Sequence, residues 1–134
     1  MTNFKELREN LSTFSDNSRT LLLALLNCLK NEQKVTWDYN VNGSIAFQER
    51  LWVLSFNINF NGIGPSGVDE FNRLLAALGA FNADLVQQAN DLSKGQLDVM
   101  PRFSSYFANE NPSVGLGVQI AASKEDRDIT INFG

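Results

Sequence analysis

A regular alternation of apolar and polar side chains near the middle of the chain constrains the fold most. From Trp52 to Phe60 every second residue is apolar, and from Ser55 onward the residues between them are serine or asparagine. Because residues two apart point to the same face of a strand, this pattern predicts a strand with one face against a core and one in water. Parallel sheets are covered on both faces, so the strand belongs in an antiparallel sheet. Its wet face carries Asn57, Asn59 and Asn61.

A second alternating run covers residues 35–41, and Asn42-Gly43 follows it as a typical hairpin signal. A three-residue loop ending at Gly43 would pair Tyr39 with Ile45 and so keep apolar side chains together. We therefore expect a hairpin turn at this place, with Gly43 in the left-handed conformation of a bulge.

The phase of the alternation changes between these two runs. Apolar positions are odd-numbered up to Phe47 and even-numbered from Trp52. A slip of one residue exchanges the two faces of a strand. A bulge or break is therefore expected within residues 48–51, and either one long bent strand or two strands result.

Helical periodicity predicts three helices. Apolar residues at steps of three and four indicate a helix before residue 15, a polar stop at 15–18, and a second helix to about residue 32. A long helix is expected at about 67–93, where Asn82 interrupts the apolar stripe. A helix lying across a sheet explains this stripe better than a coiled coil with Asn82 at its seam.

Three strands are expected after the long helix. In the first, Pro101 indicates a sheet edge or a bulge, since proline lacks the backbone donor that an inner strand needs. In the second, Gly115 and Gly117 share a face, which indicates that another element approaches closely there. The third covers residues 129–133.

Together these patterns predict an α+β fold with element order ααββ(β)αβββ. We expect one domain over residues 1–134, with an antiparallel sheet of five to six strands and the long helix packed on it. Its parts are a helical hairpin at 1–33, strands at 34–61, the long helix at 67–93 and three strands at 96–134.

Residues 62–67 spell Gly-Ile-Gly-Pro-Ser-Gly, the glycine spacing of a dinucleotide-binding loop. The preceding strand has one wet face, unlike the buried parallel strand that such a loop follows. Asp69 and Glu70 open the next helix and would repel a phosphate, and Ser66 is placed to cap it. We therefore interpret the segment as a turn from sheet to helix.

Several function classes lose support from composition. The chain has no histidine, and its single cysteine, Cys28, lies in an apolar run and is expected to be buried. We accordingly predict no metal site and no cofactor. The basic residues are scattered, so we expect no direct nucleic-acid binding. The apolar run at 21–29 is too short to span a bilayer and follows acidic residues, so we expect a cytoplasmic protein without a membrane segment.

The remaining candidates are residues suited to a protein interface. Arg102 and Tyr106 belong to types that often anchor interfaces, and they join Asn57, Asn59 and Asn61 as the candidate partner-binding residues. The leading hypothesis is a non-catalytic protein-binding module: an inhibitor, an immunity protein, an adaptor, or an assembly or secretion chaperone. The net charge of −4 suits a basic partner protein, and a homodimer stays open.

Two alternatives remain open. A cup between the sheet and the long helix could bind an apolar small molecule. An enzyme could instead use two carboxylates that converge in space. Such carboxylates need not be close in the sequence. The two close acidic pairs are Asp69-Glu70 and Asp126 with Asp128; the second could hold a metal ion, but Lys124 and Arg127 beside it are typical of a solvated turn.

Overall fold

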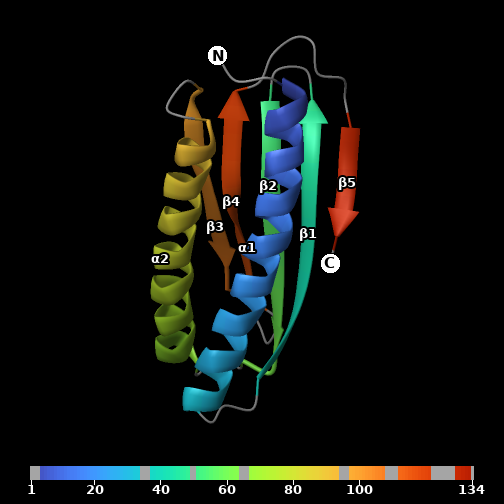
Figure 1. The fold of residues 1–134 in the computed structure, drawn as a ribbon. Coiled ribbons are helices and arrows are strands. Elements are labelled where there is room, and N and C mark those ends of the chain that lie inside the picture. Colours follow the sequence, from blue (N-terminus) through green and yellow to red (C-terminus); the bar gives the residue numbers. More distant parts are fainter. Residues whose placement is uncertain are drawn as a thin grey trace.

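The computed structural model describes residues 4–33, 37–48, 51–63, 67–93, 97–107, 112–121 and 129–133. Figure 1 shows how the helices and strands in these ranges are arranged. Their bounds are α1 Phe4–Gln33, β1 Asp38–Gln48, β2 Leu51–Asn61, α2 Val68–Leu92, β3 Val99–Tyr106, β4 Ser113–Ala121 and β5 Ile129–Phe133.

The five strands form one sheet in the order β3-β4-β2-β1-β5, and every neighbouring pair is antiparallel. Both helices lie on the same side of this sheet (Figure 1), where α2 contacts β3 and β4 and α1 contacts β1. The predicted α+β class with an antiparallel sheet is confirmed. The described elements follow one another in the order αββαβββ. One helix precedes β1 in this order, where two helices were expected.

The predicted helical hairpin at 1–33 is wrong, because α1 runs without a break from Phe4 to Gln33. The polar residues at 15–18 do not end the helix. Ser15 and Ser18 face inward and are buried, and the Ser15 hydroxyl donates to the Leu11 carbonyl one turn earlier, at 2.8 Å. A serine that satisfies its hydroxyl in this way can continue a helix instead of capping it.

The predicted turn at Asn42-Gly43 is also wrong. β1 passes through both residues in extended form, with Gly43 opposite Phe56 and Asn42 opposite Asn57. The strands pair as far as Gln48 and Leu51, so residues 49–50 connect them. The expected break within residues 48–51 is therefore present, and it is this connection between two strands. Eleven consecutive residue pairs form between β1 and β2, which a turn at Gly43 would prevent.

The same register explains the change of phase. In this antiparallel pair the odd-numbered residues of β1 oppose even-numbered residues of β2, as Ile45 opposes Leu54. The odd-numbered residues of β1 and the even-numbered residues of β2 therefore face the helices together. No bulge is needed to keep the apolar side chains on one side.

The core lies between the sheet and the two helices. The inward residues of β2 expose at most 2% of their surface: Trp52, Leu54, Phe56, Ile58 and Phe60. At one end of the core, rings pack edge to face, with Trp37 and Phe60 centred 5.5 Å apart and Phe60 and Phe71 6.2 Å apart. Burial of these large side chains is the main favourable contribution to folding.

A buried polar contact joins α2 to the sheet. The Asn82 side-chain oxygen accepts a hydrogen bond of 2.8 Å from the Gly117 backbone N–H, and Asn82 is only 4% exposed. Asn82 thus interrupts the apolar stripe because it binds β4, which agrees with a helix lying across a sheet. The bond satisfies an amide that would otherwise be buried without a partner.

Glycine is required at position 117. Its φ is 152°, and a Cβ there would lie 1.9 Å from the Leu54 carbonyl oxygen of β2. The expected close approach at this glycine is therefore that of the neighbouring backbone. Gly79, in the middle of α2, is different, since its nearest neighbour would be Phe103 Cζ at 4.0 Å.

Replacing these two glycines should have opposite effects. Gly117→Ala combines a strained backbone with a clash and should lower the free energy of unfolding by at least about 2 kcal/mol. Gly79→Ala should raise it by about 0.5–1 kcal/mol, because alanine favours a helix and the site has room. Urea denaturation measures both. Equal stability of the Gly117→Ala variant and the wild type would contradict the described path of β4.

Candidate functional site

The sheet has one face that no described helix covers, because α1 and α2 both pack on the other. We call it the helix-free face. Strand register assigns to it the odd-numbered residues of β2 and β4 and the even-numbered residues of β1 and β3. All five residues chosen from the sequence belong to this face: Asn57, Asn59, Asn61, Arg102 and Tyr106.

The register also shows which of these residues are close together. Tyr106 opposes Ser113 and Ser113 opposes Asn59, so Tyr106 and Asn59 lie in one row with a serine between them. In the next row Ser104, Gly115 and Asn57 follow one another in the same way. Asn61 is farther away, at the end of β2, and pairs with Asp38.

A shallow trough of about 530 Å³ lies on the helix-free face over β2, β4 and β3. Asn57 and Ser55 line it from β2, and Arg102 and Ser104 line it from β3. Its floor is open because Gly115 has no side chain, and a Cβ there would lie only 3.0 Å from Ser104 Oγ. The trough therefore brings together two of the residues predicted from different parts of the sequence, Asn57 and Arg102.

Among the described residues that line the trough, Arg102 is the only charged one. Its Nη1 donates to the Gln119 side-chain oxygen at 3.0 Å, which holds the guanidinium over β4. A guanidinium has five N–H donors. The trough is thus lined by amide, hydroxyl and guanidinium groups that can bind acceptors such as a carboxylate.

The lining of the trough is also partly apolar, with Pro101 and Leu116 in it, and further apolar side chains project from β3 beside it. Tyr106 is 66% exposed and Met100 is 52% exposed on the helix-free face, while Phe103 on the helix side is 42% exposed. The sequence indicated Tyr106 but not the exposure of Met100 and Phe103. Pro101 could have indicated this exposure, because proline is typical of an edge strand, and a strand at an edge exposes side chains on both faces.

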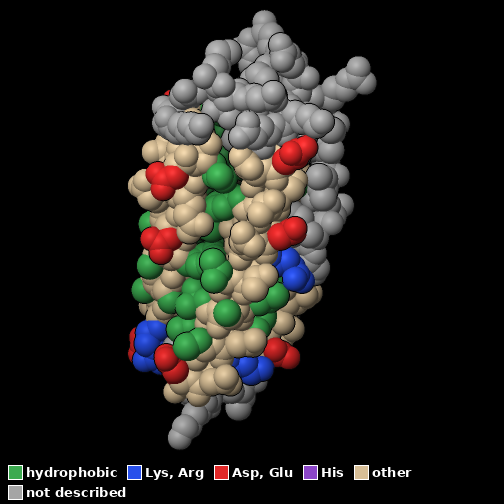
Figure 2. Space-filling model, viewed as in Figure 1, with side chains coloured by type: hydrophobic (Ala, Val, Ile, Leu, Met, Phe, Trp, Pro, Cys, Tyr) green, Lys and Arg blue, Asp and Glu red, His purple; other side chains and the backbone are tan. Residues whose placement is uncertain are grey.

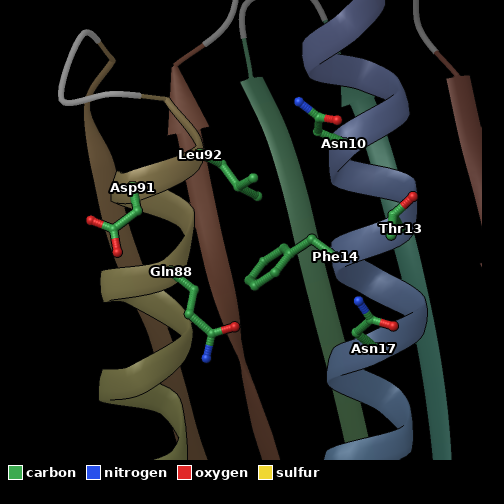
Figure 3. Close-up of a pocket in the computed structure, with 7 residues that line it drawn as sticks. All are labelled: Asn10, Thr13, Phe14, Asn17, Gln88, Asp91 and Leu92. Atoms are coloured by element: carbon green, nitrogen blue, oxygen red, sulfur yellow. The ribbon is translucent and has the colours of Figure 1, made fainter.

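A second concavity, of about 390 Å³, is a groove between the two helices (Figure 3). Phe14 of α1 and Leu92 of α2 point into it, and the side chains of Asn10, Asn17 and Gln88 surround them, whereas Asp91 points away. Figure 2 shows apolar side chains along the seam between the helices below this groove. The groove lies between the helices, not between the sheet and the long helix.

The glycine-rich segment before α2 is described only in part. Gly62 has a positive φ of 91°, as a turn after β2 requires, and Ile63 is buried. The N-cap of α2 is Gly67, without a side-chain cap, and Asp69 and Glu70 lie in the first turn. The expected cap Ser66 lies outside the described residues, as does the pair Asp126 and Asp128.

The expected burial of Cys28 is wrong, because the thiol is exposed on α1. Its Sγ donates to Glu32 Oε1 at 3.5 Å, and this hydrogen bond and the negative charge of Glu32 raise the pKa of the thiol. Among the described residues, no three His, Cys, Asp or Glu side chains are grouped as a metal site would need.

No described helix is both long enough and apolar enough to cross a membrane. The chain matches no protein-family model, no curated protein and no solved structure.

The thiol of Cys28 should react slowly with a disulfide reagent at pH 8, since its raised pKa leaves less thiolate than in a free cysteine. Glu32→Gln removes the charge and should increase the reaction rate several-fold. Glu9→Gln, an exposed change elsewhere on α1, is the matched control and should leave the rate unchanged. Identical rates for all three proteins would show that Glu32 does not influence the thiol.

Proposed function

We propose that the chain is a non-catalytic protein-binding module that contacts its partner through the helix-free face, around β3. The observation that carries this proposal is the position of Arg102 and Tyr106 on the same uncovered face as Asn57 and Asn59, with Tyr106 two-thirds exposed. Arginine and tyrosine are, with tryptophan, the residue types enriched among strong interface contacts.

The chemistry of this face suits a protein surface better than a small substrate. Short amide and hydroxyl side chains held on a sheet lose little conformational freedom when a partner binds. The exposed Tyr106 and Met100 supply apolar area at the border of the trough. Apolar anchors beside satisfied polar groups are the usual composition of a specific protein interface.

An inhibitor, an immunity protein, an adaptor, and an assembly or secretion chaperone all fit this proposal. We place the function in the cytoplasm, because an exposed unpaired cysteine such as Cys28 persists best in a reducing compartment. The net charge of −4 favours a partner that is basic overall, and a second copy of the chain is a further possible partner.

A second candidate function is the binding of an apolar small molecule. It is favoured by the groove between α1 and α2, where Phe14 and Leu92 form an apolar floor with amide side chains around it. Its volume of about 390 Å³ falls within the usual range of ligand sites. This candidate predicts that native mass spectrometry of the gently purified protein shows a bound small molecule.

The two candidates can be separated by affinity capture from the native host with three proteins. Wild type should recover a stoichiometric partner protein, and Arg102→Ala combined with Tyr106→Ala should lose it. Each such anchor contributes about 1–2 kcal/mol or more, so affinity should fall at least about tenfold. Arg73→Ala with Asn72→Ala changes two exposed residues of α2 and is the matched control that should keep the partner.

Circular dichroism of each variant checks that the fold is retained. Equal recovery of the partner by the wild type and the Arg102→Ala, Tyr106→Ala variant would contradict the proposed face. Recovery of a small molecule and of no protein would favour the groove between the helices.

A further inference from the structure

Strand β3 forms one edge of the sheet, and no described strand pairs with its outer side. Every residue from Met100 to Tyr106 is exposed. An edge strand has a row of backbone N–H and C=O groups without partners in the sheet, and another chain can pair with them. The question is which groups of β3 are free.

The strand register of β3 and β4 shows which backbone groups of β3 point away from β4. The Ala121 N–H donates to the Asp98 carbonyl at 2.9 Å, so the backbone groups of Asp98 point toward β4. In an antiparallel strand the N–H and C=O of one residue point to the same side, and successive residues alternate. Even-numbered residues of β3 therefore direct their backbone groups toward β4, and odd-numbered residues direct theirs to the open edge.

Pro101 falls on the open side of this alternation. Its missing N–H costs no bond to β4, which explains why a proline is tolerated in the strand. It also interrupts the row of edge donors between Val99 and Phe103. Proline is a common means by which proteins prevent unwanted strand pairing. Pairing along the first half of β3 is therefore hindered.

The second half of β3 has no such protection. Phe103 and Ser105 both direct an N–H and a C=O to the edge, where no described strand pairs with them, and residues 102–106 contain neither proline nor lysine. Phe103 also exposes its ring on the helix side of the strand. This half therefore has the backbone groups and the apolar side chain that an added strand needs.

We propose that the Phe103–Ser105 edge binds an extended segment of a partner protein, which adds a strand to the sheet and alternates apolar with acidic residues. The inference rests on the proposed protein-binding function and names its partner class: a protein that is basic overall but acidic in the segment that reaches this edge. On the helix-free face the added strand would lie beside the backbone of Arg102, whose exposed side chain binds Gln119 over β4 through Nη1. Turned toward the edge, this guanidinium would meet a carboxylate of the added strand as a complementary charge. On the other face, an apolar side chain would cover Phe103. Backbone bonds give such complexes affinity, and alternate side chains give specificity.

The direct test titrates the isotope-labelled full chain with the synthetic peptide acetyl-Thr-Val-Glu-Val-Glu-Val-Thr-amide and follows backbone amide signals. The amide signals of Phe103 and Ser105 should shift, while those on the far side of the sheet stay in place. A twin peptide with lysine in place of glutamate should bind on the order of tenfold more weakly, because it meets Arg102 with a like charge.

Two substitutions at the edge should act in opposite directions. Ser105→Pro removes one free N–H without breaking a bond to β4 and should weaken peptide binding on the order of tenfold. Pro101→Ala restores an edge donor and should strengthen it. The amide shifts of the wild type test the proposal even where Ser105→Pro fails to fold.

Any one of three results with the peptides would overturn the inference: no shift at Phe103 and Ser105 at millimolar peptide, equal binding of both peptides, or unchanged binding by folded Ser105→Pro. Concentration-dependent shifts without peptide, together with a dimer in sedimentation, would overturn it in favour of a second copy at the edge. If Ser105→Pro still captures the partner that Arg102→Ala with Tyr106→Ala loses, the protein-binding function stands and strand addition fails.

Discussion

The one-sided burial of β2 determines where both helices pack and which face of the sheet they leave uncovered. Its inward side chains are almost completely buried, whereas the outward side chains of Ser55, Asn57 and Asn59 are amides and hydroxyls. Burying that polar side without partners would cost several kcal/mol for each group. Both helices therefore pack on the apolar side, and no described helix covers the opposite side of the sheet.

The contact between α2 and β4 links the packing of the helices on the sheet to the shape of the proposed site. Asn82 binds the Gly117 amide from the helix side, and the backbone of β2 approaches Gly117 too closely for a side chain. Gly115, two residues away, leaves the floor of the trough open between Asn57 and Ser104. The glycines of β4 thus serve both the packing of the sheet and the shape of the surface beside Arg102.

Local periodicity predicted what depends on neighbours in the sequence: the half-buried β2, the long α2, the break before Leu51 and the edge marked by Pro101. Periodicity failed where pairing between residues far apart in the sequence determines the local structure. Asn42-Gly43 is a strong local turn signal, but pairing along the whole of β1 outweighs it. Residues 15–18 resemble a helix stop, yet Ser15 bonds within its own helix. Five site residues were predicted from the sequence. That they share one face, and that Asn57 and Arg102 line one trough, depends on the strand order, which periodicity does not specify.

Cysteine labelling along β2 measures whether one side of this strand is buried and the other is exposed. In a Cys28→Ser background, Asn57→Cys and Ile58→Cys place a thiol on successive residues, one on the helix-free face and one in the core. A charged thiol reagent should modify Asn57→Cys about as fast as an unfolded peptide, and Ile58→Cys at least about a hundredfold more slowly, because the latter needs local unfolding. Equal protection of both thiols would show that another layer covers the face and would contradict the account.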